Sequence, residues 1–314
     1  MPACYIGIDT SNYTTSVALA SEAGEIVANL KAPLPVKAGE RGLRQSDAVF
    51  AHTKNLPALM RALGALLQEY TPKAVCVSDR PRGVEDSYMP CFLSGVVAGE
   101  AIAAASGIPL YTTSHQDGHL MAALYSSGAP LVQGKPFGAF HVSGGTTEML
   151  LATPDGTAFT VEKIGGTADL NAGQAIDRIG VLMGLAFPAG PSLEKLALEN
   201  DKPVPRPRIS VREGECHISG LENMAAALYR ETGDKPLVAA FVLRFIEDTL
   251  FAMASHLRAA HGPLPLVFAG GVMSNRIIAG GLTARLGEGV YFAAPQFSAD
   301  NAAGVALLCR AKAL

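Results

Sequence analysis

Two short segments of this chain alternate between hydrophobic and polar positions on either side of a polar turn. In the first segment, residues 5–20, Ile6 and Ile8 point to one side of a predicted strand. Val17 and Leu19 do the same in the strand that follows. The residues between the two strands are small and polar, which favours a turn. The pattern therefore predicts a β-hairpin at the start of the chain.

A second segment, residues 138–152, has the same pattern and aligns with residues 6–20 at an offset of 132 residues. The identical aligned pairs are Ser11 and Ser143, Thr14 and Thr146, Thr15 and Thr147, Leu19 and Leu151, and Ala20 and Ala152. A repeat at the start of each half is typical of an internal duplication, so we expect two related domains. We place them at residues 1–112 plus 292–314 and at residues 113–291, each opening with a hairpin whose tip faces a shared ligand cleft.

The rest of the chain alternates helical periodicity with short apolar runs. The expected helices are 55–69, 93–105, 114–125, 172–183, 237–258 and 301–312, and the expected further strands are 74–77, 265–269 and 290–293. The Pro- and Arg-rich stretch 202–212 is expected to be an exposed loop. Strands that alternate with helices indicate an α/β fold in both domains.

Composition limits the class of protein. Of the 314 residues, 49% are hydrophobic and only 17% are charged, so the chain can bury a large core and is not disordered. The net charge of −3 excludes a uniformly basic surface, so any binding of nucleic acid needs a local patch or a basic partner. The five cysteines form no C-x-x-C pair, which fits a reducing cytoplasm. No signal peptide or membrane span is predicted, so we expect a cytoplasmic protein.

His115 and His119 are candidate metal ligands. They are four residues apart, so on a helix they share one face and can bind one metal ion. The residues between them are Gln116, Asp117 and Gly118, so the glutamate of a zinc protease is missing. Two ordinary surface histidines remain the alternative. Asp300, which follows a predicted strand, is the candidate third ligand.

Three further motifs indicate a bound anion or nucleotide. The first is the run Val142–Thr147, in which glycines expose backbone N–H groups, although a plain hairpin is the alternative. The second is a strand that ends in Gly270-Gly271 and leads into a helix near Asn275. The third is Asp177 on a helix, followed by Gly190; Asp177 can bind a ribose or a base, or can cap a helix or pair with its neighbour.

Together, and in this order, these motifs resemble the Kae1/TsaD/Gcp family of tRNA threonylcarbamoyladenosine synthesis proteins, formerly called O-sialoglycoprotein endopeptidases. The resemblance runs from Gly7 to Asn301. It implies two actin-like (ASKHA, RNase H-like) domains and transfer of a threonylcarbamoyl group from an adenylate to N6 of the tRNA adenosine 3′ of the anticodon. It also implies an iron or zinc ion, an adenylate or ATP as ligand, and tRNA and TsaB-like pathway proteins as partners.

The resemblance assigns roles to individual residues. His115, His119 and Asp300 correspond to the metal ligands of the family. The residues that correspond to nucleotide contacts are His141, Val142, Ser143, Gly144, Gly145, Asp177, Gly190 and Asn275.

The chain departs from the family pattern at its first turn. Tyr13 and Thr14 stand where the family has two acidic residues. The general base is therefore not identified, and Asp9 is predicted to be the remaining catalytic carboxylate of the cleft. The alternative for Asp9 is a turn residue that bonds its own backbone.

Other functions are compatible with the same fold. One is a non-catalytic, TsaB-like partner, which would lack the metal site. Another is a small-molecule transferase or a kinase, which would act without tRNA. A peptidase is disfavoured because no general base lies between the histidines. Both a homodimer and a heterodimer remain open.

Overall fold

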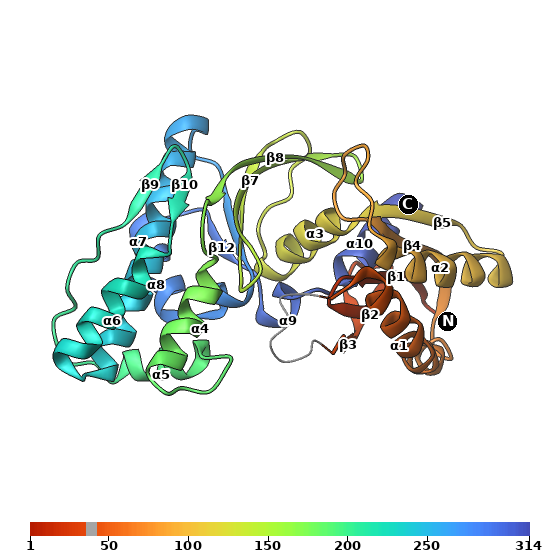
Figure 1. Ribbon diagram of the computed structural model, residues 1–314. Coiled ribbons are helices and arrows are strands. Elements are labelled where there is room, and N and C mark those ends of the chain that lie inside the picture. The colour runs from red at the N-terminus through yellow and green to blue at the C-terminus, as the bar shows by residue number, and fades with distance from the viewer. Residues whose placement is uncertain (36–42) are drawn as a thin grey trace. The chain divides into compact units, whose positions relative to one another are not determined.

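The computed structural model describes residues 1–35 and 43–314, and within them the chain divides into two compact units. The first unit comprises Met1–Tyr125, Pro154–Thr160 and Gln296–Leu314, and the second comprises Ser126–Thr153 and Val161–Pro295. Figure 1 follows the chain through them from red to blue. The first unit extends past residue 112, where the sequence placed the boundary, because residues 110–114 pair with the N-terminal sheet. Both candidate histidines therefore belong to the first unit.

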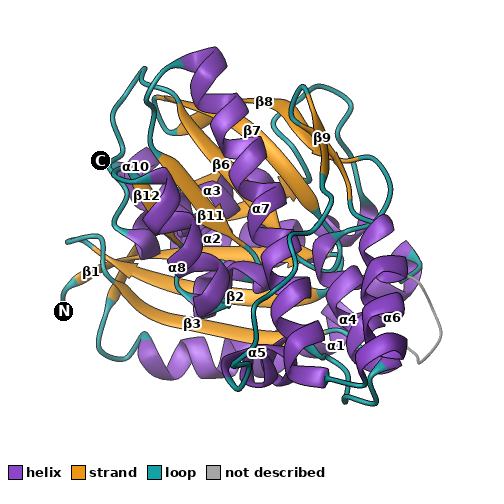
Figure 2. Ribbon diagram, turned by 90° about the vertical axis from the view of Figure 1, so that its left-hand side faces the viewer, coloured by secondary structure: helices purple, strands orange, loops and turns teal. Residues whose placement is uncertain are grey.

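Five strands form the sheet of the first unit among its described residues, in the order β3-β2-β1-β4-β5. Their bounds are β1 (Ala3–Ser11), β2 (Thr14–Ser21), β3 (Ile26–Pro33), β4 (Thr71–Arg80) and β5 (Leu110–Ser114). The strands β1, β2 and β3 are antiparallel neighbours, and they lie side by side in Figure 2. The strands β4 and β5 run parallel to β1.

Helices cover both faces of this sheet. Their bounds are α1 (Gln45–Leu66), η1 (Pro90–Phe92), α2 (Leu93–Ser106), α3 (His115–Ser127), α9 (Pro295–Ser298) and α10 (Ala303–Ala313). Alternate residues of a strand point to opposite faces. Ile6 and Ile8 accordingly pack with residues of α1 and α2, and Tyr5 packs with residues of α10. A Cβ atom at Gly7 would lie 2.3 Å from the Ala306 amide nitrogen, so glycine is what allows α10 to lie directly on β1.

The sheet of the second unit repeats this arrangement. Every residue of that unit is described, and the whole sheet has the order β12-β11-β6-β7-β8-β10-β9. The strand bounds are β6 (Phe137–Val142), β7 (Thr147–Asp155), β8 (Ala158–Thr167), β9 (Ser210–Arg212), β10 (Glu215–His217), β11 (Leu266–Ala269) and β12 (Val290–Phe292). The series β8-β7-β6-β11-β12 corresponds to β3-β2-β1-β4-β5, which supports an internal duplication.

The core of the second unit is built around its longest helix, α7, with aromatic stacking within the sheet. The helix bounds are α4 (Ala172–Leu182), α5 (Gly190–Leu198), α6 (Gly220–Thr232), α7 (Lys235–His261), η2 (Gly271–Ser274) and α8 (Arg276–Leu286). The α7 side chains Phe241, Phe245 and Leu250 are buried in one continuous hydrophobic cluster. Phe268 of β11 stacks on Phe140, with ring centroids 4.5 Å apart.

Most of the elements expected from the sequence are present. Both hairpins are confirmed, and their registers pair Ser11 with Thr14 and Val142 with Thr147. The first helix begins at Gln45 rather than at residue 55, and Pro57 lies inside it. The expected loop 202–212 ends in the short strand β9. No helix in the described part of the chain is both long and apolar enough to cross a membrane.

Candidate functional site

The two histidines lie on the first turns of α3, which begins directly after β5. The Ser114 hydroxyl caps this helix by accepting a hydrogen bond of 3.0 Å from the Asp117 amide, as expected for serine at this position. His115 and His119 are therefore one turn apart on the same face. Their ring centroids are 4.3 Å apart and their Nε2 atoms are 3.0 Å apart.

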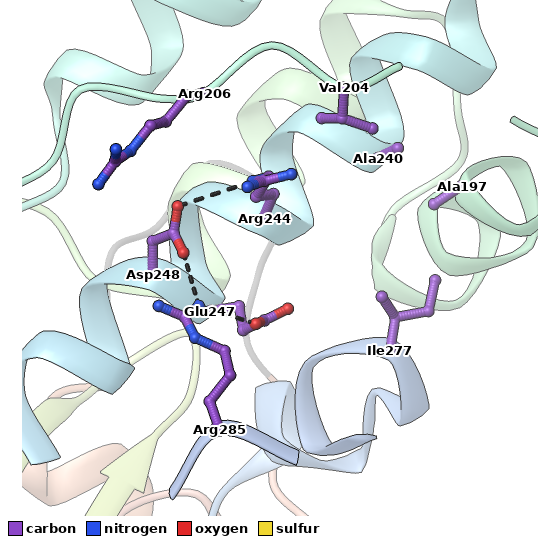
Figure 3. A pocket seen from close by; sticks show the side chains of 9 residues that line it. All are labelled: Ala197, Val204, Arg206, Ala240, Arg244, Glu247, Asp248, Ile277 and Arg285. Carbon is purple, nitrogen blue, oxygen red and sulfur yellow. Dashed lines mark hydrogen bonds and ion pairs between the residues drawn. The ribbon is translucent and has the colours of Figure 1, made fainter. Parts of the chain in front are cut away.

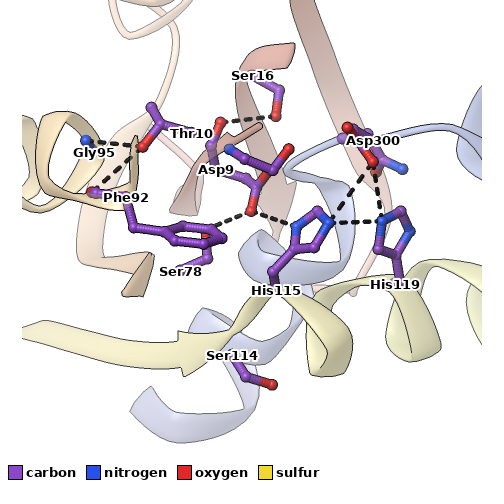
Figure 4. A network of polar contacts seen from close by, with 12 residues as sticks. Asp9, Thr10, Ser16, Ser78, Phe92, Gly95, Ser114, His115, His119 and Asp300 are labelled. Carbon is purple, nitrogen blue, oxygen red and sulfur yellow. Dashed lines mark hydrogen bonds and ion pairs between the residues drawn. The ribbon is translucent and has the colours of Figure 1, made fainter. Parts of the chain in front are cut away.

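Asp300 approaches these rings from the segment between α9 and α10. Its Oδ1 atom lies 3.2 Å from His119 Nε2 and 3.7 Å from His115 Nε2 (Figure 4). All three residues belong to the first unit, although Asp300 is far from the histidines in sequence. The structure thus brings together the three side chains that the sequence nominated as metal ligands, in a cluster that could hold a metal ion.

The donor set and its spacing fit a divalent metal. Two ligands on one tetrahedral ion, each about 2.0–2.1 Å from it, are about 3.4 Å apart. The three distances between donor atoms, 3.0, 3.2 and 3.7 Å, lie on both sides of this value. Imidazole nitrogens with a carboxylate oxygen suit zinc or iron. His115, His119 and Asp300 would hold such an ion and leave part of its coordination sphere open.

Asp9 lies behind His115, near the end of β1, and has no exposed surface. Its Oδ1 atom is 2.8 Å from His115 Nδ1 and also accepts a hydrogen bond from the Ser78 hydroxyl. Its Oδ2 atom accepts from the Ser11 amide at 3.3 Å. The carboxylate that the sequence nominated for catalysis is therefore fully buried and bonded to a candidate metal ligand.

The charges of this cluster favour a bound cation. Burial disfavours the charged form of His115, yet Asp9 and Asp300 outweigh it and raise the pKa of His115 to about 9. Burial likewise opposes ionisation of the two carboxyls, yet His115 and the Ser78 hydroxyl lower the pKa of Asp9, and His119 and His115 lower the pKa of Asp300. Two ionised carboxylates at one site need a positive charge, which a proton on imidazole or a metal ion can supply.

The glycine-rich run of the second unit forms the turn between β6 and β7. The Ser143 hydroxyl accepts hydrogen bonds from the amides of Gly145 and Thr146, at 3.2 and 3.1 Å. Gly144 and Gly145 are exposed, and a Cβ atom at Gly145 would contact nothing within 4 Å. The turn rests on the first residues of α4, because the Gly173 amide donates to the Ser143 carbonyl oxygen at 3.1 Å.

The other candidate nucleotide contacts lie at helix starts of the same unit. Asp177 of α4 accepts a hydrogen bond of 2.8 Å from the Ala189 amide, next to Gly190 at the start of α5. Asn275 caps α8, and its Oδ1 atom accepts from the amides of Ile277 and Ile278 at 3.0 and 3.1 Å. Asp177 thus holds the start of α5 in place and does not pair with its neighbour.

His141 and Val142 complete this candidate set at the end of β6. His141 pairs with Ala269 of β11, so the carboxyl ends of two parallel strands lie side by side. This is the edge at which α/β sheets bind ligands. Gly270 continues β11 past this edge at φ +103°, where a Cβ atom would lie 2.2 Å from the Val142 carbonyl oxygen. Only glycine fits there.

The sequence did not nominate two residues that hold these sites together. Ser78 of β4 donates to Asp9, and Glu194 of α5 accepts a 2.7 Å hydrogen bond from the Arg276 amide at the start of α8. Neither residue belongs to a recognisable local motif. The position of Ser78 near the carboxyl end of a buried strand was the one signal that could have indicated it.

A separate pocket of about 560 Å³ lies elsewhere in the second unit (Figure 3). Its lining residues are Ala197, Val204, Arg206, Ala240, Arg244, Glu247, Asp248, Ile277 and Arg285. Arg285 bridges Glu247 and Asp248 at 2.9 and 2.6 Å, so much of the charge in this pocket is internally paired. None of the nominated residues lines it.

Comparison with protein families gives a match that covers most of the chain. The model of the TsaD family, described as tRNA N6-adenosine threonylcarbamoyltransferase, matches residues 42–307. The matched region contains the candidate metal ligands and all the candidate nucleotide contacts.

Several solved structures resemble the whole chain at low sequence identity. HypF from T. kodakarensis has a TM-score of 0.64 at 11% identity, covering 99% of this chain and 47% of its own. Full-length HypF with bound phosphate and nucleotide has a TM-score of 0.60 at 12% identity, with 98% and 55% coverage. This chain thus spans about half the length of the HypF chains. The activator of 2-hydroxyisocaproyl-CoA dehydratase from Clostridium difficile, with bound ADPNP, has a TM-score of 0.55 at 14% identity, with 99% and 95% coverage. These likenesses show the fold, which is the actin-like, two-sheet ASKHA fold.

Proposed function

The chain belongs to the TsaD family of tRNA N6-adenosine threonylcarbamoyltransferases, and on this premise we propose that it transfers a threonylcarbamoyl group from threonylcarbamoyl-adenylate to N6 of the tRNA adenosine 3′ of the anticodon. The observation that carries the proposal is the cluster of His115, His119 and Asp300, whose nitrogen and oxygen donors lie 3.0–3.7 Å apart. A TsaB-like, non-catalytic protein would not need this cluster.

In the proposed reaction the N6 amine attacks the carbamoyl carbon of the adenylate. A C–N bond forms, the bond from that carbon to the phosphate oxygen breaks, and AMP leaves with the electron pair while the amine gives up a proton. A divalent metal, iron or zinc, would supply Lewis-acid stabilisation of the developing negative charge. The part of this chain is to hold that ion through His115, His119 and Asp300.

The turn at Ser143–Gly145 is the proposed phosphate site. Its glycines carry no side chain that would obstruct the approach of an anion. The Gly145 and Thr146 amides donate to the Ser143 hydroxyl, and a phosphate oxygen would replace that hydroxyl as their acceptor. Asp177, Gly190 and Asn275 are assigned to the nucleoside on the family premise. Asn275 uses its side-chain oxygen to cap α8, so the two N–H donors of its amide are the atoms it can offer to a ligand.

The proton acceptor for the N6 amine is not assigned to a side chain. Tyr13 and Thr14 occupy the two acidic positions of the family, and Asp9 is fully buried. Solvent or the phosphate of the leaving AMP can accept the proton of the N6 amine without the help of a side chain. We also propose that a pathway partner of the TsaB-like kind supplies part of the affinity for tRNA, since the chain carries a net charge of −3.

The test combines purified protein with threonylcarbamoyl-adenylate and unmodified tRNA, with and without candidate partner proteins. Mass spectrometry of the nucleosides measures the modified adenosine. Modification is expected with the wild type and is expected to be lost in His119→Ala. His261→Ala is the matched control, because His261 is an exposed residue at the end of α7. Unmodified tRNA under every condition, with metal and nucleotide bound, would overturn the assignment of tRNA as the acceptor.

A further inference from the structure

The buried carboxylate of Asp9 is bonded to the side of the His115 ring that faces away from the metal cluster. The Nδ1 atom of His115 lies 2.8 Å from Asp9 Oδ1, whereas its Nε2 atom lies 3.0 Å from His119 Nε2. Because Asp9 accepts a hydrogen bond from Nδ1–H, the neutral form of His115, which is the form that binds a metal, has its lone pair on Nε2. This is the tautomer that a metal ligand at this position requires.

Other contacts fix both Asp9 and the ring that it holds. The second carboxylate oxygen of Asp9 accepts from the Ser11 amide, and its main-chain carbonyl accepts from the Ser16 hydroxyl at 3.2 Å. The Phe92 ring lies against the His115 ring, with centroids 5.9 Å apart. The Phe92 carbonyl in turn accepts a hydrogen bond of 3.3 Å from the Thr10 hydroxyl (Figure 4).

We propose that Asp9 is a positioning residue, which sets the tautomer and orientation of His115 for metal binding, and that it does not contact the substrate. This inference rests on the metal site of the proposed function and deepens it. Two observations carry it: the absence of any exposed surface on Asp9, and the bond from its Oδ1 atom to the outer nitrogen of a candidate ligand. Carboxylates placed in this way orient metal-bound histidines in general.

Ser78 supports the same arrangement from the neighbouring strand. Its hydroxyl is fully buried and donates to the Asp9 oxygen that also accepts from His115. A hydroxyl donor here keeps Asp9 an acceptor and holds the carboxylate toward the ring. Loss of the Ser78 hydroxyl should therefore lower the metal affinity, but by less than loss of the Asp9 carboxylate does.

The test measures metal binding without any assay of activity. The affinity of the full chain for Zn²⁺ and Co²⁺ is determined by competition with a chromophoric chelator, for the wild type and for Asp9→Ala, Asp9→Asn, Ser78→Ala and His119→Ala. We expect the affinity to fall about 10–100-fold in Asp9→Ala, which is typical for loss of an outer partner of a ligand. Asp9→Asn should lie between Asp9→Ala and the wild type, because an amide oxygen can still accept from Nδ1. Asp79→Asn is the matched control, since Asp79 is the next residue on β4 and pairs with Arg80.

A second measurement does not depend on the folding of any variant. Nitrogen NMR of the wild type with labelled histidine reports which ring nitrogen of His115 carries the proton, and a proton on Nδ1 in the zinc-bound protein is the expected result. A proton on Nε2, or equal affinity in the wild type and in a folded Asp9→Ala, would overturn the positioning role. A wild type that binds neither metal would instead overturn the metal site of the proposed function.

Discussion

Gly304 of α10 packs directly on Gly118 of α3. A Cβ atom at residue 304 would lie 1.8 Å from the Gly118 carbonyl oxygen and 2.8 Å from the Ala122 amide nitrogen. No side chain fits into this space, so the backbones of the two helices touch. Because His119 follows Gly118 and Asp300 lies shortly before α10, this contact helps to bring the carboxylate to the histidines.

Gly304→Ala is expected to push α10 away from α3. The chain should lose about 1–3 kcal/mol of unfolding free energy, as is usual when a packed interior is overfilled. The displacement should also weaken metal binding, because Asp300 moves with α10. Denaturant unfolding measures the loss of stability, and chelator competition measures the loss of metal affinity.

The control is Gly64→Ala in α1, where a Cβ atom would meet nothing within 4 Å. It should leave the stability unchanged or raise it by up to about 1 kcal/mol, and a Gly304→Ala variant that behaves in the same way would contradict the packing argument.

Gly173→Ala is expected to displace the glycine-rich turn of the second unit. A Cβ atom at residue 173 would lie 2.6 Å from the Gly144 amide nitrogen, so the turn must move. We expect at least a tenfold weaker affinity for AMP or ATP, which corresponds to about 1.4 kcal/mol. Isothermal titration calorimetry measures the affinity. Gly220→Ala at the start of α6 is the control, because nothing would contact its new Cβ atom. Equal nucleotide affinity in Gly173→Ala and Gly220→Ala would show that the turn is not part of the nucleotide site.

Asp169 gives the protein a defined dependence on acid. Burial opposes its ionisation, but the Ser219 hydroxyl and nearby amides donate to its carboxylate and lower its pKa to about 2. This value is below the pKa of about 3.9 in an unfolded chain, so the stabilisation is present above about pH 4 and is lost as the pH falls through about 2.

Asp169→Asn should therefore be less stable than the wild type at neutral pH. The expected difference is about 1 kcal/mol, allowing for the 26% exposure of the Asp169 side chain. The difference should shrink as the pH approaches about 2. Urea unfolding at a series of pH values tests this prediction, with Glu162→Gln at an exposed position as the control. A difference that stays constant with pH would show that the effect of the substitution is not electrostatic.

Arg285 is expected to stabilise the second unit by neutralising two partly buried acids. Its guanidinium pairs with Glu247 and Asp248, whose side chains are 16% and 15% exposed, and it stacks on the Phe251 ring at 3.9 Å. Arg285→Ala should cost roughly 1–3 kcal/mol, because Glu247 loses its partner and Asp248 keeps only its 3.8 Å contact with Arg244. Arg178→Ala is the matched control. It breaks an exposed pair with Glu222 and should cost less than about 0.5 kcal/mol. Equal costs in thermal or chemical unfolding would count against the role of burial.

The cysteines are expected to be inert in the native protein. All five are free and buried, and burial raises the pKa of the Cys4 and Cys91 thiols to about 11 and that of Cys76 and Cys216 to about 12. The thiolate is the reactive form, so a thiol reagent should modify none of them before unfolding and all five afterwards. Rapid modification of the folded protein would show that one of these sites opens locally.

The sequence by itself determined the class of fold and the identity of the chemical groups. Alternation with period 2 around polar turns identified both hairpins, because a strand with one buried face leaves that pattern. The i, i+4 spacing of His115 and His119 identified a pair of ligands, because one turn of helix separates them. These features are local, so they can be read from neighbouring residues.

Only the tertiary structure decided how distant segments meet. The approach of Asp300 to the histidines depends on a helix contact between Gly118 and Gly304, which no local pattern indicates. The boundary near residue 112 could not be located from periodicity, because β5 pairs with a strand that lies far from it in sequence. From the sequence, Asp9 was predicted to be a catalytic carboxylate. Its burial and its hydrogen bond to His115 result from packing between β1, β4 and α3, so the sequence could not indicate them. Burial and long-range contact arise from the whole chain, and for that reason the structure was needed to find them.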